Sequence, residues 1–138
     1  MMRRFAIALA IAIASNLQAQ GTLVVSQNKC ANDKMQQIQQ TNDSLFMPIV
    51  QELVNEGKLL GAGTAYHAWG DEWNVVVWYT ATNAQAFFDA FNELFRRMQQ
   101  RHPTVITQQM AWCTDHKDNI YRMGRATVAA APPANRQP

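Results

Sequence analysis

The sequence predicts an α+β domain in which four strands and two long helices follow one another in the order β-α-β-β-α-β. Two kinds of pattern predict this class. Short runs rich in β-branched and aromatic residues are typical of strands, and two longer segments repeat apolar residues at helical intervals. The chain has 138 residues, and the part that follows its amino-terminal segment is long enough for one domain.

Residues 1–19 are predicted to be a secretory signal peptide. Arg3 and Arg4 provide a basic start, residues 5–15 are apolar, and Ala19 is a small residue at the expected cleavage point. The apolar run is shorter than the roughly 20 residues of a membrane-spanning helix, which disfavours the alternative of an uncleaved anchor. We therefore expect a periplasmic or secreted protein with no membrane anchor after cleavage.

The charge of the chain after cleavage argues against a nucleic-acid partner. The chain has 12 Lys and Arg against 10 Asp and Glu, and two of the basic residues belong to the signal. No basic stripe remains, and the cluster of Arg96, Arg97 and Arg101 is predicted to be the solvated face of a helix. The sequence has no Gly-rich phosphate loop, nucleophile elbow or Cys-x-x-Cys pair, so no cofactor is expected.

Cys30 and Cys113 are the only cysteines of the chain. In an oxidising compartment two cysteines allow a single intramolecular pairing, so we predict a disulfide between them. Two free buried thiols are the alternative, and a metal-binding pair is a more distant one.

The first part of the domain is predicted to form a strand over residues 22–27 and then a long helix. The helix is indicated by apolar residues at helical intervals between Met35 and Leu53, with Asn42 in a gap of the pattern. Pro48 removes one backbone donor and crowds the preceding turn, so we expect a kink or a break over residues 45–47.

Two further strands follow over residues 59–69 and 73–80, joined by a turn at Gly70-Asp71. Gly61, Gly63 and His67 share one face of the earlier strand, which suggests that another backbone or helix approaches closely there. Both faces of the later strand are apolar. In so small a chain we expect the second cover to come from a partner subunit.

The last part of the domain is predicted to start with a capping box at residues 82–85 and an amphipathic helix rich in Phe. That helix ends before Pro103. Residues 104–113 are compatible with a short helix or an extended segment, and residues 119–123 are predicted to be the final strand. The domain is expected to span residues 20–125, and residues 126–138, rich in Ala and Pro, to be a disordered tail.

This order of elements, with right-handed crossovers, predicts a ferredoxin-like fold: a split β-α-β arrangement with an antiparallel sheet and both helices on one face. The other face of the sheet would be buried if two sheets paired into a dimeric barrel. We therefore expect a homodimer through the sheet.

The chain resembles the dimeric α/β-barrel superfamily in this element order and in the run from His67 to Val76, His-Ala-Trp-Gly-Asp-Glu-Trp-Asn-Val-Val. It is more narrowly similar to a group of small exported bacterial proteins of unassigned function, which share that hairpin and the segment from Cys113 to Tyr121, Cys-Thr-Asp-His-Lys-Asp-Asn-Ile-Tyr. Some members of the superfamily are cofactor-independent oxygenases, and others degrade haem or bind small ligands. The resemblance implies a cavity between sheet and helices.

The candidate catalytic residues are His67 as a general base, with Asn74 or His116 polarising the substrate. The alternative for His67 is a histidine at a strand end that bonds to the backbone or to Asp71. A metal site that combines His67, His116 and nearby carboxylates has no supporting ligand spacing, so no metal is expected and a polar network between the last segment and the hairpin is favoured.

Four aromatic residues are candidates for stacking on a flat ligand: Tyr66, Trp69, Trp73 and Trp78. Aromatic rings on strands more often belong to a core or an interface, and a dimer interface is the leading assignment for some of them.

The function predicted from these features is that of an exported domain that binds a small apolar or aromatic ligand, or a protein partner, without catalysis. The alternative is a cofactor-independent oxygenase or isomerase with His67 as base. A structural subunit of an envelope assembly is a third possibility.

Overall fold

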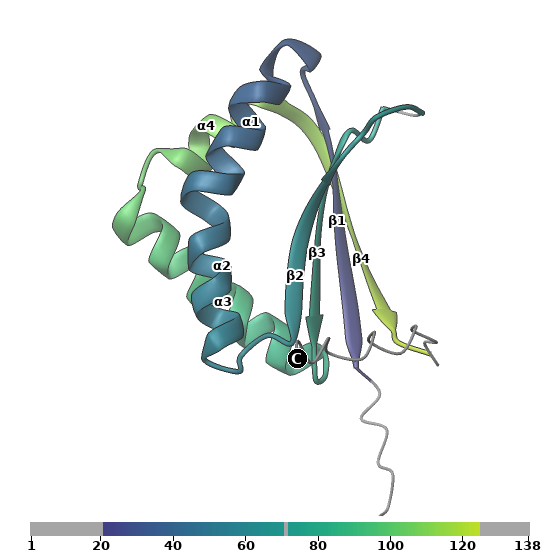
Figure 1. Cartoon of the computed structure of the whole chain (residues 1–138), viewed down its shortest axis with the longest axis vertical. Helices are drawn as coiled ribbons and strands as arrows, with labels where there is room; N and C mark the ends of the chain where they lie inside the picture. The colour runs from purple at the N-terminus through teal and green to yellow at the C-terminus, as the bar shows by residue number, and fades with distance from the viewer. Residues whose placement is uncertain (1–20, 71, 125–138) are drawn as a thin grey trace, which may run out of the picture.

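A single antiparallel sheet organises the structure, a computed structural model that describes residues 21–70 and 72–124. Its strands are β1 (Thr22–Cys30), β2 (Gly61–Tyr66), β3 (Val75–Ala81) and β4 (Cys113–Arg122), and they lie side by side in the order β2-β3-β1-β4. All helices cover one face of this sheet (Figure 1). The predicted split β-α-β fold class is therefore confirmed. The predicted signal peptide and the whole of the predicted tail lie outside the described residues.

The first long helical segment contains a π turn. It consists of the short 3₁₀ helix η1 (Asn32–Lys34), α1 (Met35–Thr41), the π segment η2 (Asn42–Phe46) and α2 (Met47–Asn55). The N–H of Met47 donates to the carbonyl of Asn42, five residues back, and Pro48, which has no N–H to donate, follows at once. The predicted irregularity next to Pro48 is thus a π turn that keeps the helix continuous.

The other helices are α3 (Ala84–Arg101) and α4 (Val105–Trp112). Helix α3 is capped by Asn83, whose side chain accepts from the N–H of Ala86 at 2.9 Å, so the cap lies one residue after the start of the capping box predicted at residues 82–85. Residues 104–113, for which a short helix and an extended segment were both compatible with the sequence, form mostly the helix α4. Strand β4 begins at Cys113, earlier than predicted, because pairing with β1 holds its very polar residues in an extended conformation.

The main core lies between the helices and the sheet. Its members are buried apolar residues from β1, β3, helices α2, α3 and α4, and the connection between α2 and β2: Val24, Ile49, Val50, Leu53, Leu59, Tyr79, Ala81, Phe87, Ala90, Leu94, Met98 and Val105. A smaller cluster of Cys30, Ile38 and Val75 lies at the other end of the sheet, with Tyr66 and Trp112 packed against it. Burial of both clusters in one layer provides the main stabilisation of the fold.

No helix of the described residues lies on the opposite face of the sheet. Cross-strand partners share a face, so Leu23, Val25 and Trp78 belong to this open face, where Val25 pairs with Trp78. The glycines of β2 face the same side, and a Cβ built on Gly63 would lie 2.7 Å from the Trp78 ring. The small residues of β2 therefore make room for an indole of the neighbouring strand, and not for another backbone or helix of the same chain.

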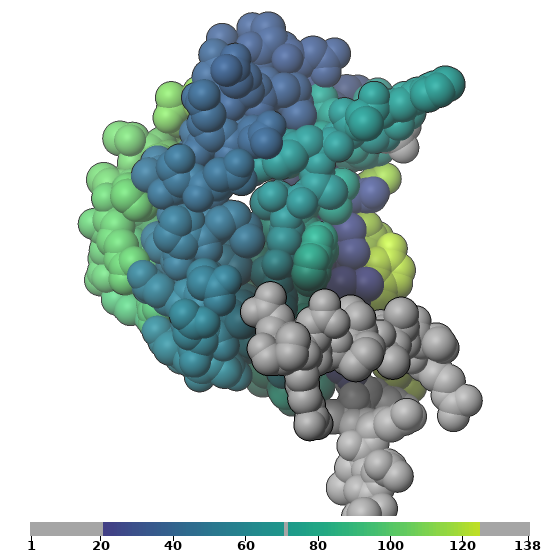
Figure 2. Space-filling view, in the orientation of Figure 1, coloured from purple at the N-terminus to yellow at the C-terminus, as the bar shows by residue number. Residues whose placement is uncertain are grey.

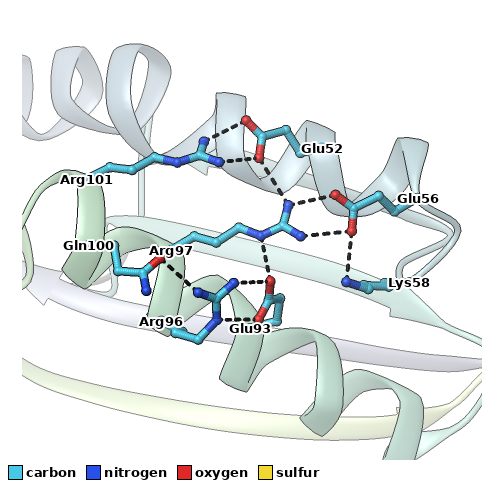
Figure 3. A network of polar contacts seen from close by, with 8 residues as sticks. All are labelled: Glu52, Glu56, Lys58, Glu93, Arg96, Arg97, Gln100 and Arg101. Carbon is cyan, nitrogen blue, oxygen red and sulfur yellow. Dashed lines mark hydrogen bonds and ion pairs between the residues drawn. The ribbon is translucent and has the colours of Figure 1, made fainter.

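The clustered arginines join the two long helical segments. Figure 3 shows the Arg97 side chain in ion pairs with three carboxylates. Glu52 lies on α2, Glu56 follows the end of α2, and Glu93 lies on α3 with Arg97 itself. This guanidinium side chain is only 12% exposed. Hydrogen bonds from arginine lower the pKa of Glu56 and of Glu93 from 4.5 to about 2. The predicted solvated face is therefore an ion-pair network that connects α2 to α3.

Candidate functional site

A hollow lined by ten described residues lies beneath the loop that joins β2 to β3, and we call it the hairpin pocket. Its volume is about 310 Å³. Figure 2 shows this hairpin projecting beyond the body of the molecule. The lining residues come from the hairpin loop, from the end of β1 and from the first helical turns: Lys29, Cys30, Asn32, Met35, His67, Ala68, Trp69, Gly70, Glu72 and Asn74.

Asn74 closes the bottom of the pocket and is buried. Its carboxamide oxygen accepts from the N–H of Cys30 at 2.8 Å, and its amide nitrogen donates to the carbonyl of Cys30 at 2.7 Å. The same nitrogen donates to the side chain of Asn32 at 3.1 Å. The β1–β3 ladder ends at the pair Asn28 and Val75, and beyond it the amide of Asn74 bonds to the backbone of Cys30 in place of a strand partner. These three bonds occupy the group that was expected to polarise a substrate.

His67 follows directly on β2 and is exposed. Its backbone N–H donates to the carbonyl of Asn74 at 2.9 Å, which extends the hairpin by one more bond. Its imidazole lies against Gly70: a Cβ built there would be 2.6 Å from Nε2. Gly70 has a φ of 138°, a conformation that residues with a Cβ rarely adopt. A turn that requires glycine therefore holds the imidazole at the pocket.

The hairpin is tied to the neighbouring strands through charged side chains. Lys29 of β1 forms an ion pair with Glu72 of the loop. Lys117 of β4 lies 4.2 Å from the ring centroid of Trp73, within the range of a cation–π interaction. The last segment therefore contacts the hairpin, as expected, and the contact is between the charge of Lys117 and the ring of Trp73.

A disulfide joins Cys30 to Cys113, as predicted. These residues are paired at the end of the ladder between β1 and β4, and Cys30 lines the hairpin pocket. The bridge therefore anchors one wall of the pocket to the start of β4.

His116 does not join His67. It lies on β4, which is one edge of the sheet, whereas His67 follows β2, which is the opposite edge. Strands β3 and β1 separate them, so the hypothesis that the final segment brings the two histidines together is wrong within one chain. His116 is exposed and lies 3.9 Å from the carboxylate of Asp118. Among the described residues, no group of three His, Cys, Asp or Glu side chains is placed to hold a metal ion.

The four aromatic candidates point to different places. The Tyr66 hydroxyl accepts from the amide of Asn42 at 3.1 Å and packs against the smaller core cluster. Trp69 is 93% exposed and lines the hairpin pocket. Trp73 contacts Lys117, and Trp78 covers Gly63 on the open face of the sheet. Of the four, Trp69 is the one that lines this pocket.

The sequence reasoning missed Lys29, Asn32 and Met35 as pocket residues. No local pattern marks them, because they reach the hairpin only through the pairing of β1 with β3. It also missed that the buried Asn42 bonds to both Tyr66 and Gln109. A polar residue in a gap of an apolar helical pattern is a signal that could have indicated such a role.

No protein-family model and no curated protein matches the sequence. Solved structures do match the fold. A dimeric ferredoxin-like protein from an uncultured marine organism has a TM-score of 0.62 at 6% identity and covers 80% of this chain and 92% of its own.

The chain has the ferredoxin-like fold. Two other solved structures support this assignment. A NIPSNAP family protein of unknown function from Agrobacterium tumefaciens has a TM-score of 0.65 at 10% identity, over 80% of this chain and 94% of its own. A candidate antibiotic biosynthesis monooxygenase from Nitrosomonas europaea has a TM-score of 0.54 at 12% identity, over 77% and 92%. At these identities, the similarity establishes a shared ferredoxin-like architecture and says nothing of shared chemistry.

Proposed function

We propose that this protein is an exported, homodimeric binding domain that holds a small ligand in the hairpin pocket without converting it. The observation that carries the proposal is the pocket itself, where exposed Trp69 and His67 lie above a floor whose polar groups are already bonded. An indole and the thioether of Met35 suit an apolar or aromatic ligand, and one imidazole suits a single polar group on it.

The absence of catalysis is inferred from how the polar groups are used. The carboxamide of Asn74 is occupied by Cys30 and Asn32, and His116 lies on the far edge of the sheet. Acid–base turnover needs a group within hydrogen-bond reach of the proton it moves and usually a second group to stabilise the charge that develops. In the described part of one chain, neither Asn74 nor His116 is placed to polarise a substrate beside His67.

The experiment is mass spectrometry of small molecules that co-purify with the native exported protein, followed by titration of the compound found. We expect Trp69→Ala to weaken its binding by about tenfold or more, since a buried aromatic contact contributes on the order of 1 kcal/mol or more. Phe88→Ala is the matched control, because Phe88 is also an exposed aromatic residue but lies on α3. Equal affinity in the wild type and in Trp69→Ala would exclude the hairpin pocket as the site.

The alternative function is a cofactor-independent oxygenase or isomerase with His67 as base, and the position of His67 at the pocket is the observation that favours it. Incubation of the co-purified compound with the protein in air distinguishes the two. Product formation or oxygen uptake that is lost in His67→Gln would replace the binding proposal with the enzymatic one.

The homodimer is inferred from the open face of the sheet. Leu23, Val25 and Val76 are half-buried there, and Trp78 and Tyr121 are 36% and 50% exposed. An apolar sheet face of this kind is stabilised by a second copy, and the similar protein from a marine organism is described as dimeric. Light scattering of the wild type is expected to give twice the chain mass, and Val25→Glu the mass of one chain. A monomeric wild type would contradict this part of the proposal.

Export is inferred from the predicted signal and from the disulfide, which persists in oxidising compartments. None of the described helices is long and apolar enough to cross a membrane. Mass spectrometry of the amino terminus of the protein isolated from its native cells tests the expected cleavage after Ala19.

A further inference from the structure

A second hollow, which we call the amide groove, lies in the helical layer between α1–η2 and α4, and its volume is about 330 Å³. Figure 1 shows α4 beside α1, on the side of the helices away from the open face of the sheet. None of its lining residues belongs to the hairpin pocket: Gln37, Gln40, Thr41, Ser44, Leu45, Gln108 and Trp112. It lies at the lower end of the volumes of small-ligand sites, roughly 300–1,000 Å³.

The lining residues form two facing helical stripes. Residues 37, 40, 41 and 44 are three or four apart and therefore lie on one side of the α1–η2 helix. Gln108 and Trp112 are four apart and lie on one side of α4. Each wall thus presents its polar side chains toward the same space.

The chemistry of these walls is uniform. Five of the seven lining residues carry an amide or a hydroxyl, and none of the seven is charged. Amides and hydroxyls can both donate and accept, which matches a ligand whose own groups do both. A charged ligand would find no counter-charge among the lining residues, so a neutral ligand is favoured. Trp112 adds an indole face, and Leu45 a second apolar contact.

The groove is held in shape by bonds that do not use the amides of Gln40 and Gln108. Gln109 donates to the side-chain oxygen of Asn42 at 2.7 Å, and Asn42, only 4% exposed, donates to the Tyr66 hydroxyl at 3.1 Å. This chain of bonds fixes α4 to η2 and to the sheet. Walls that are ordered before binding lose less entropy when a ligand arrives.

The far end of α4 is fixed as well. The N–H of Ala31 donates to the carbonyl of Trp112 at 2.9 Å, and the next residue, Cys113, is bridged to Cys30. By contrast, no hydrogen bond to another described residue occupies the side chains of Gln40 and Gln108. The two amides are therefore available on walls that are themselves rigid.

We propose that the amide groove is a binding site for a neutral saccharide. The hydroxyls of a sugar ring donate and accept toward the amides and hydroxyls of both helices, and its apolar face lies against the indole of Trp112. This site shares no lining residue with the hairpin pocket, so the saccharide proposal does not depend on the ligand proposed there.

The test is calorimetric titration of the full exported chain, with its disulfide intact, with maltotriose, cellotriose and N,N′-diacetylchitobiose. At least one of these probes is expected to bind with a Kd that is roughly millimolar or tighter. Amide NMR signals of residues 37–45 and 105–112 should shift on addition of the sugar, and those of the hairpin loop should stay in place.

Substitutions locate the site. Gln40→Leu and Gln108→Leu are each expected to weaken binding about tenfold, because each leaves a sugar hydroxyl without its partner. Gln39→Leu is the matched control: it makes the same change on the same helix, at an exposed residue that does not line the groove. Trp69→Ala in the hairpin pocket should leave sugar binding unchanged.

The proposal is overturned if none of the three sugars binds the wild type, or if Gln39→Leu weakens binding as much as Gln40→Leu does. It is also overturned if the shifted signals belong to the hairpin loop, or if an uncharged peptide of similar size binds the groove more tightly than every sugar. Thermal melting of each variant confirms that the protein being titrated is folded.

Discussion

At the scale of single residues, Gly70 determines the shape of the hairpin and the position of His67. Its φ of 138° strains any residue with a Cβ, and the added atom would in addition meet the imidazole at 2.6 Å. One glycine therefore combines a conformational and a packing requirement, and it does so at the rim of the hairpin pocket.

Gly70→Ala is expected to lower the free energy of unfolding by about 1–3 kcal/mol, because of strain at a positive φ and the clash with His67. Urea denaturation measures the difference. Gly124→Ala is the control, since no atom lies within 4 Å of the position its Cβ would take, and its change should stay within about 0.5 kcal/mol. Indistinguishable unfolding curves for the two variants would contradict this account of the turn.

At the scale of elements, helix α3 contributes a row of aromatic rings to the core. Phe87 lies 5.5 Å from Tyr79 and 5.4 Å from Phe91, between ring centroids, and is 5% exposed. Its neighbour Phe88 is 46% exposed. Two adjacent residues of one type therefore differ almost entirely in burial, which makes them a matched pair.

Phe87→Ala is expected to cost about 3–5 kcal/mol of unfolding free energy, because it leaves a cavity between α3 and β3. Phe88→Ala should cost less than about 1 kcal/mol, since its ring is partly in water already. Guanidinium denaturation, monitored by circular dichroism, gives both values. A similar loss in both variants would mean that α3 presents a different face to the sheet.

The arginine–glutamate network makes the contact between α2 and α3 sensitive to acid. Hydrogen bonds from Arg97 and Lys58 lower the pKa of Glu56 from 4.5 to about 2, and hydrogen bonds from Arg96 and Arg97 do the same for Glu93. A carboxyl whose pKa is lower in the folded state contributes stability above the unfolded value. That contribution is complete above pH 4.5 and is lost as the pH falls through about 2.

We therefore expect the melting temperature to fall as the pH is lowered from about 4.5 to about 2, and the fall to be shallower in Arg97→Met. Added salt should reduce the effect, because these carboxylates are accessible to solvent. Arg122→Met serves as the control, since Arg122 is exposed on β4 outside the network. An unchanged pH profile in Arg97→Met would show that other carboxyls dominate acid unfolding.

At the scale of the whole molecule, the disulfide connects the two ends of the domain. Cys30 and Cys113 are 83 residues apart in sequence, so the bridge closes most of the described chain into one loop. It also lies between the two hollows: Cys30 lines the hairpin pocket, and Trp112 of the amide groove precedes Cys113.

Replacing both cysteines by serine is expected to lower the free energy of unfolding by about 4–5 kcal/mol in the chain-entropy account. Denaturation of the wild type with and without a dithiol reductant should show a loss of similar size. The double variant should be insensitive to the reductant. A reductant effect that persists in the double variant would rule out the bridge as its cause.

Much of the fold could be predicted because it depends on local patterns. Pro48 disturbs the helical hydrogen bonds and Pro103 follows the end of α3, as the chemistry of proline predicts, and the Phe-rich stripe of α3 has helical periodicity in any context. The disulfide could be predicted because only two cysteines are present. Residues 104–113 could not be assigned, because their weak pattern becomes a helix only through contacts such as Gln109 with the buried Asn42.

The candidate site was less predictable, and the reason is geometric. The sequence by itself determined the order of the elements, the hairpin with its glycine and the single cysteine pairing, since each follows from short-range backbone chemistry or from a count. The tertiary structure alone decided which polar groups meet. Pairing β1 with both β3 and β4 places His67 and His116 at opposite edges and brings Asn74 to the backbone of Cys30. Contacts between residues distant in sequence depend on the register of the strands and on the direction of each side chain, and no local pattern encodes these.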